Sequence, residues 1–257
     1  MNRDGVASTV SIVRYRSGAP LDTTPGSAFA PSCEFERLGP SHERKAAVHT
    51  ILEQLLLDDD ELKELREAGN YDDLPVDPYT TGGYRSRRFA RVTFDGQALH
   101  RTVDQSFAQG VDVNSYLGGV VRVYEPVHDA FLTAGVVRSI CELLTARAEL
   151  AGGTIGIHQI RISCSRGQEG SPAPEGVHRD GVKFVYICCV DRAGIAGAHT
   201  QLFEIGPDTV GDVPFFDEVL AEGACLLVND ERLAHYTTPI SPAFEIGYRD
   251  ALVMTIE

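Results

Sequence analysis

The stretch PEGVHRDG at residues 174–181 places His178 and Asp180 two positions apart. Residues i and i+2 of an extended strand project from the same side, so both side chains can bind one metal ion. The His-x-Asp pattern alone is weak evidence, because it is common by chance and an ordinary surface pair gives the same letters. The stretch therefore predicts a metal site only if a third ligand accompanies it.

A candidate for this third ligand is His235, which follows the apolar segment 224–228. Two histidines and one carboxylate on one face of an octahedral metal leave three positions open, the arrangement of non-haem Fe(II) oxygenases. We therefore expect His178, Asp180 and His235 to bind the metal and to form the catalytic centre.

Arg249 stands at the start of the last apolar segment, 248–256. 2-Oxoglutarate chelates iron through its C1 carboxylate and its ketone, and its buried C5 carboxylate must then be paired, for which the planar guanidinium is well suited. Thr237 and Thr255 are candidate hydroxyl donors to the same co-substrate. The alternative is that Arg249 pairs with Asp250 or Glu245 at the surface.

The composition limits the classes of partner. The chain has 257 residues and a formal net charge of −14, so it repels phosphate backbones and anionic membranes, and we expect neither nucleic acid nor membrane as a partner. No stretch approaches the roughly 20 apolar residues of a membrane helix, and the first residues lack the apolar run of a secretory signal. Six scattered cysteines favour a reducing cytoplasm.

The apolar patterning predicts helices followed by many short strands. We expect residues 1–40 to form an arm packed on the core, and 41–257 to form one domain with a helical annex at 41–70 and 129–150. Helical spacing predicts helices at 41–57, 59–68 and 129–150, and strands are predicted at 89–94, 118–124, 154–163, 182–190, 199–205, 224–229 and 248–256. This order predicts a mainly β fold, a barrel or sandwich with helices packed outside it.

Several of these stretches together resemble the double-stranded β-helix (jelly-roll, cupin-like) 2-oxoglutarate oxygenases, and more narrowly the bacterial family of the L-isoleucine 4-hydroxylase. The matching stretches cover about two thirds of the chain: 84–89, 118–122, 158–161, 174–181, 230–235 and 247–250. One departure from the family pattern is His199, which either faces the pocket or is an ordinary strand histidine.

The resemblance implies Fe(II), 2-oxoglutarate and O2, with ascorbate as the reductant in vitro. It also implies oxidation of an unactivated C–H bond of a free L-amino acid or close derivative, usually hydroxylation, with succinate and CO2 as co-products. Desaturation or ring closure in natural-product biosynthesis is the alternative within this chemistry. A non-catalytic or 2-oxoglutarate-independent cupin-like metal-binding module is the alternative from another class. Monomer and homodimer are equally compatible with the sequence.

A free amino acid needs an arginine for its carboxylate and an acid for its ammonium group. Glu175 is the ammonium candidate, although it could instead cap a turn. Arg122 and Arg161 are placed ahead of the cluster at 85–88, which could form a solvated face. Tyr116 either lines the pocket or packs in the core.

Overall fold

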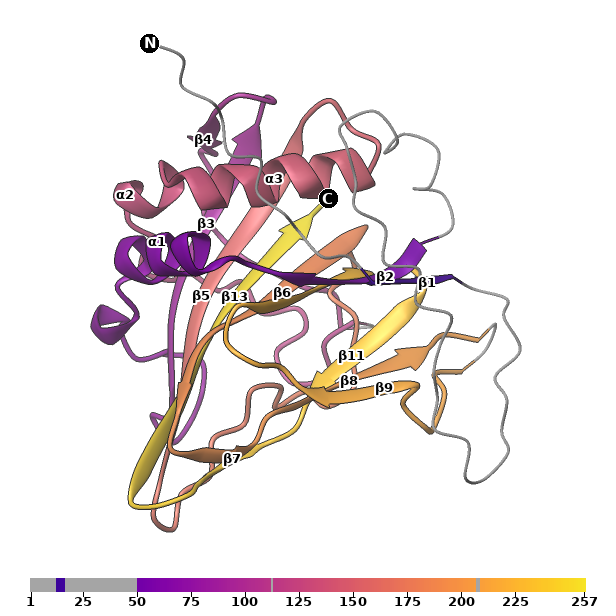
Figure 1. Cartoon of the computed structure of the whole chain (residues 1–257). Coiled ribbons are helices and arrows are strands. Elements are labelled where there is room, and N and C mark those ends of the chain that lie inside the picture. Colours follow the sequence, from indigo (N-terminus) through magenta and orange to yellow (C-terminus); the bar gives the residue numbers. More distant parts are fainter. Residues whose placement is uncertain (1–12, 17–49, 112, 207–208) are drawn as a thin grey trace.

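An eight-stranded antiparallel sheet dominates the fold (Figure 1). The computed structural model describes residues 13–16, 50–111, 113–206 and 209–257. In spatial order the strands are β1 (Val13–Arg16), β2 (Thr50–Leu56), β10 (Ala224–Asn229), β6 (Phe184–Ala193), β13 (Ile246–Ile256), β5 (Gly153–Ser165), β3 (Arg85–Phe94) and β4 (Leu99–Arg101).

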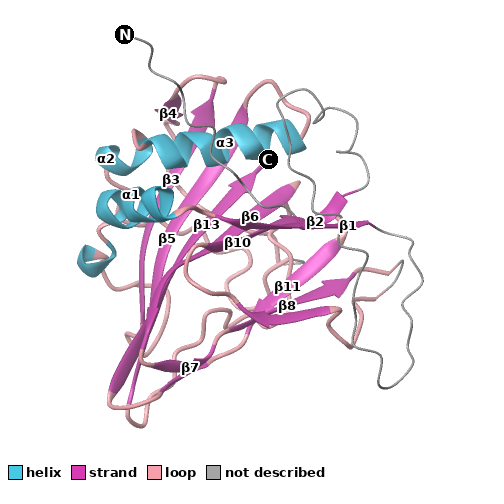
Figure 2. Ribbon diagram, viewed as in Figure 1, coloured by secondary structure: helices cyan, strands magenta, loops and turns pink. Residues whose placement is uncertain are grey.

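Two smaller sheets lie on one side of the large sheet, and the helices cover its other side (Figure 2). The first small sheet contains β11 (Leu233–Thr237), β8 (His199–Glu204) and β9 (Phe216–Val219), and the second contains β12 (Ile240–Pro242) and β7 (Ile195–Gly197). The helices are α1 (Asp59–Gly69), the 3-10 turn η3 (Tyr71–Asp73), α2 (Asp129–Leu132) and α3 (Gly135–Arg147). This confirms the predicted mainly β class with a jelly-roll core and flanking helices.

Strand β6 shows why a continuous apolar run forms a strand here. Val185 and Ile187 are buried between the large and small sheets, whereas the alternating Tyr186 and Cys188 are buried under the helices. A strand covered on both faces needs apolar side chains of both parities, each contributing on the order of 1.5–3 kcal/mol by burial. The central strands are therefore rigid supports for the polar residues that they carry.

Helix α1 begins where the sequence predicts it. Asp58 accepts a hydrogen bond from the backbone N–H of Glu61, whose side chain accepts one in return from the backbone N–H of Asp58. The Glu64 carboxylate then accepts hydrogen bonds from the backbone N–H groups of Gly135 and Val136 at the start of α3. A carboxylate at a helix N-terminus is stabilising, and it ties the two helices together.

Three predicted elements differ from the structure. The helix predicted at 41–57, and with it that part of the 41–70 annex, is wrong for residues 50–56, which form β2; residues 41–49 lie outside the described ones. Leu52 and Leu55 are buried on opposite faces of β2, and such two-sided burial imitates helical spacing. The predicted strand 118–124 is a loop with a single bridge at Arg122, and the helix at 129–150 is divided into α2 and α3. Of the predicted arm 1–40, the structure describes only 13–16.

Candidate active site

The side chains of His178, Asp180 and His235 converge between the large sheet and the smaller sheets. His178 and His235 form an antiparallel bridge, with N–H to oxygen distances of 3.0 and 2.8 Å, which places their rings on the same side. Nε2 of His178 lies 3.9 Å from Oδ1 of Asp180, and Nε2 of His235 lies 3.8 Å from Oδ2. One ligand atom from each residue lies within 4.8 Å of the others, so the three residues named from the sequence do come together.

The tautomer of His178 leaves the correct nitrogen for a metal. Its Nδ1 donates a hydrogen bond of 2.9 Å to the carbonyl oxygen of Gly176, so Nε2 is the nitrogen with a free lone pair. His235 is buried, and burial lowers its pKa to about 4, with the neighbouring His178 lowering it further and Asp180 opposing the shift. The His235 ring is therefore available as a neutral ligand, as binding of Fe(II) requires.

A buried carboxylate, Asp230, holds the loop that carries the ligands. It accepts hydrogen bonds from three consecutive backbone N–H groups, those of Asp180, Gly181 and Val182, at 3.0, 2.8 and 3.1 Å. Burial, together with the charge of Asp180, raises the pKa of Asp230. Oδ1 of Asp230 also lies 3.9 Å from Nδ1 of His235, which has no hydrogen-bond partner among the described residues, so Asp230 fixes the Asp180 loop and lies beside the second histidine.

Arg249 lines the same pocket as the three metal-site residues, and it is buried. The alternative surface pairs do not form, because Asp250 binds Arg161 and Glu245 pairs with Arg166. Within the described ranges no carboxylate lies within ion-pair distance of Arg249, and its Nη2 has no hydrogen-bond partner. A buried cation with an unused donor fits the C5 carboxylate of 2-oxoglutarate.

The two predicted threonines are separated by the structure. Thr237 lines the pocket with Arg249, as predicted for a hydroxyl near the co-substrate. Thr255 lines an adjoining cavity with Phe107 and Asp180 instead, because it lies six positions along β13 from Arg249. Thr255, predicted as a hydroxyl donor to the co-substrate, is therefore not among the residues that line the pocket of Arg249.

Four residues were predicted to bind the substrate, and three of them line the pocket: Arg122, Glu175 and Tyr116. The fourth, Arg161, does not. It lies on the helix-covered side of β5, where it donates to Asp250 at 2.6 and 2.7 Å and to Asp72 at 2.6 Å. Its β5 neighbours Ile160 and Ile162 face the pocket, so strand alternation turns Arg161 away.

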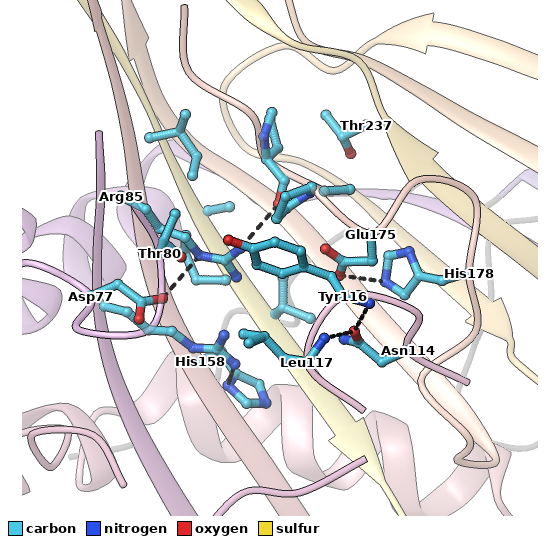
Figure 3. Close-up of a pocket in the computed structure, with 18 of the residues that line it drawn as sticks. Asp77, Thr80, Arg85, Asn114, Tyr116, Leu117, His158, Glu175, His178 and Thr237 are labelled. Atoms are coloured by element: carbon cyan, nitrogen blue, oxygen red, sulfur yellow. Dashed lines mark hydrogen bonds and ion pairs between the residues drawn. The ribbon is translucent and has the colours of Figure 1, made fainter. Parts of the chain in front are cut away.

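Strand β3 contributes two arginines that the sequence left undecided. Arg85 and Arg87 are buried and line the pocket, whereas Arg88 points to the other side and donates to the carbonyl oxygen of Asp73. Alternation along the strand was the available signal, because it puts Arg85 and Arg87 on one face and Arg88 on the other. Figure 3 shows Arg85 close to Asp77, with which it forms an ion pair of 3.4 Å.

Other polar lining residues were not predicted as site residues, notably Gln109, Asn114 and His158. Gln109 accepts hydrogen bonds from Asn114 and Arg122, and its amide donates to Oδ1 of Asp180 at 2.9 Å. These residues lie in loops or in the middle of an apolar strand, where position depends on the tertiary fold. His199, in contrast, points away from the pocket and lies 2.9 Å from the exposed Asp217.

Comparison with known proteins agrees with this site. Residues 68–255 match the family model described as 2OG-Fe dioxygenase. This match spans well over half of the chain, and it includes all three metal-site residues and Arg249. The chain belongs to the 2OG-Fe dioxygenase family, and it is a 2-oxoglutarate-dependent oxygenase that uses Fe(II), 2-oxoglutarate and O2.

Individual relatives are more distant. The L-isoleucine-4-hydroxylase of Bacillus thuringiensis is 22% identical over 218 residues, covering 80% of this chain and 88% of the relative. A BsmA homologue from Methylobium petroleophilum has a TM-score of 0.65 at 26% identity, covering 76% of this chain and 80% of that one. IDO from Bacillus thuringiensis has a TM-score of 0.61 at 18% identity, covering 79% and 93%. The last similarity shows the shared fold.

No helix in the described part of the chain combines the length and the apolar character needed to cross a membrane.

Proposed function

We propose that this oxygenase oxidises an unactivated C–H bond of a free L-amino acid or close derivative, with hydroxylation as the outcome. His178, Asp180 and His235 would hold the Fe(II), and Arg249 with Thr237 would hold 2-oxoglutarate. The observation that carries this proposal is the buried Arg249 guanidinium, which shares one pocket with the metal-site residues and has no carboxylate partner among the described residues.

The remaining pocket charges suit an amino acid. Glu175 is a carboxylate on the metal side of the pocket, and Arg87 and Arg122 supply guanidinium groups. A free amino acid presents an ammonium group and a carboxylate, which need such opposite partners when they are taken out of water. The similarity to a protein named L-isoleucine-4-hydroxylase supports the same substrate class.

The bound iron would supply the oxidising chemistry, and the residues of this chain would position the reactants. Asp230 fixes the loop of Asp180, and Gln109 donates to the Asp180 carboxylate, so the carboxylate is held in one orientation. Tyr116 and Leu117 line the pocket and would limit the access of water to the reacting C–H bond.

The test is a reconstitution without air, with Fe(II), 2-oxoglutarate, ascorbate and a panel of free L-amino acids, followed by admission of oxygen. We expect succinate formation that depends on one class of amino acid, and a product heavier by one oxygen atom. Arg249→Ala should abolish it, whereas Arg166→Ala, at an exposed ion pair with Glu245, should not. A product lighter by two hydrogens would indicate desaturation or ring closure. Iron binding without any consumption of 2-oxoglutarate would refute the proposal.

A further inference from the structure

Besides Arg249 and the ion-paired Arg85, two more buried guanidinium groups face the pocket. Arg87 on β3 and Arg122 in the following loop both lie over the ring of Phe107, at 5.2 and 4.4 Å from its centroid. Both line the pocket that contains the metal-site residues. They are therefore neighbours on one wall of the pocket, which Phe107 holds together.

Neither guanidinium is neutralised by the described part of the protein. Arg87 contacts Nδ1 of His158 and the hydroxyl of Tyr124, and Arg122 donates to Oε1 of Gln109 at 2.9 Å, so all of these partners are uncharged acceptors. The Nε of each arginine has no hydrogen-bond partner. Among the described residues no carboxylate lies within ion-pair distance of either one, in contrast to Arg85 with its partner Asp77.

His158 does not supply a compensating group. Burial lowers its pKa well below the ordinary value, and the nearby arginines lower it further, so the ring is neutral and accepts a hydrogen bond from Arg87. Burial also lowers the pKa of Arg87 to about 10, which leaves the guanidinium charged at neutral pH. The wall therefore carries two positive charges.

On the side of the pocket opposite this wall, one carboxylate has no arginine or lysine partner among the described residues. Asp77 is paired with Arg85, and Asp180 belongs to the metal site, whereas Glu175 has no arginine or lysine partner among the residues described. Its Oε1 lies 3.3 Å from Nε2 of His178, the nitrogen that a metal would occupy. In Figure 3, Glu175 and His178 lie on one side of the drawn cluster and Asp77 and His158 on the other.

We infer that the substrate is an α-amino acid with a second carboxylate. Its two carboxylates pair with Arg87 and Arg122, and its ammonium group pairs with Glu175. This inference rests on the proposed function and names the substrate class for the same site. A substrate with one carboxylate would leave one buried guanidinium without a counter-charge, which burial disfavours.

The inference is tested by calorimetric binding to protein loaded with Mn(II) and saturated with 2-oxoglutarate, in the absence of oxygen. The ligands are matched pairs, L-glutamate with L-glutamine and L-aspartate with L-asparagine, together with L-isoleucine and O-phospho-L-serine. We expect at least one acidic amino acid to bind on the order of 100-fold more tightly than its amide, because the amide cannot form the second charged pair.

The variants Arg87→Gln and Arg122→Gln should each lose most of this preference. Arg88→Gln, at the adjacent outward-facing position, should keep it. Thermal unfolding of each variant, with the unchanged affinity for Mn(II), shows that the site is intact. Loss of selectivity in Arg88→Gln as well would overturn the assignment.

Tighter or equal binding of L-glutamine, L-asparagine or L-isoleucine would overturn the inference while leaving the proposed function standing. Preferential binding of O-phospho-L-serine would indicate a substrate with a phosphate in place of the second carboxylate, and it would overturn the inference too. Binding of L-glutamate only to Mn(II) protein without 2-oxoglutarate would show that it occupies the co-substrate position, again against the inference. If no amino acid binds or stimulates succinate formation, the proposed function itself fails.

Discussion

Replacing Asp230 by asparagine should weaken metal binding without removing a metal ligand. The buried carboxylate receives the backbone N–H groups of Asp180, Gly181 and Val182 at 2.8–3.1 Å. An asparagine can turn its oxygen towards Gly181 and Val182, but its NH2 group then faces the N–H of Asp180. The variant therefore loses at least one bond at the residue that contributes the carboxylate ligand.

The size of the effect follows from this count. Hydrogen bonds to a charged acceptor contribute about 1.5–3 kcal/mol and neutral ones about 1 kcal/mol, so replacing three charged bonds by two neutral ones loses about 2.5–7 kcal/mol of bonding. The neutral amide is easier to bury than the carboxylate, which offsets part of this loss, so we expect the metal-free protein to be destabilised by about 2 kcal/mol. Orienting groups of this kind typically change metal affinity by about 10–100-fold.

The assay combines urea unfolding of the metal-free protein with Co(II) titration, in which the visible absorption reports the coordination geometry. Asp217→Asn is the matched control, because Asp217 also accepts hydrogen bonds but is exposed and lies away from the pocket. It should leave the Co(II) affinity and spectrum unchanged. Asp230→Asn protein that is destabilised yet binds Co(II) with the wild-type affinity and spectrum would refute the argument, since Asp230 would then support only the fold.

Three further predictions concern separate parts of the molecule. Arg249→Met should raise the dissociation constant for 2-oxoglutarate about 100-fold in calorimetry, because the buried charge-assisted pair is lost, and an unchanged value would contradict its role. Burial lowers the pKa of His158 well below its ordinary 6.5, so only the unfolded chain takes up a proton as the pH falls below 6.5, and the free energy of unfolding declines. His158→Gln should reduce this decline by roughly 1.4 kcal/mol per pH unit, measured by urea unfolding. Arg147→Met, which removes hydrogen bonds of 2.8 and 3.2 Å to the buried Glu53 between α3 and β2, should destabilise the protein by about 3 kcal/mol, and a loss below about 1 kcal/mol would show that the pair contributes little.

The metal site could be predicted because its residues are close together in the sequence or follow a clearly apolar segment. His178 and Asp180 are two positions apart, and His235 follows an apolar strand, so spacing and order sufficed. The mainly β class was predictable for a similar reason, since most strands are apolar runs bounded by turns. Segment 50–56 was mispredicted because it is buried on both faces, where apolar spacing no longer distinguishes helix from strand.

The residues on the substrate side of the pocket were harder to predict. Successive side chains of a strand face opposite sides, and the sequence does not show which alternate set faces the pocket. Arg161 and Arg87 are both arginines within strands, yet Arg161 is bound to Asp250 on the helix-covered side and Arg87 lines the pocket. Loop residues such as Gln109 carry no periodicity at all. Their place depends on contacts made only in the folded chain, here with Asp180.

Parity also explains how the fold can separate structural from functional arginines. β3, β5 and β13 are paired side by side, and their pocket-facing positions include Arg87 and Arg249, while their helix-facing positions include Arg88 and Arg161. A shift of one residue in register would exchange the two sets, placing ion-paired arginines in the pocket and unpaired ones against apolar helices. The packing of the apolar residues on both faces prevents this shift. Among the described residues Arg87 and Arg249 have no carboxylate partner, so the apolar core must offset the cost of burying them, and an anionic ligand would lower that cost on binding.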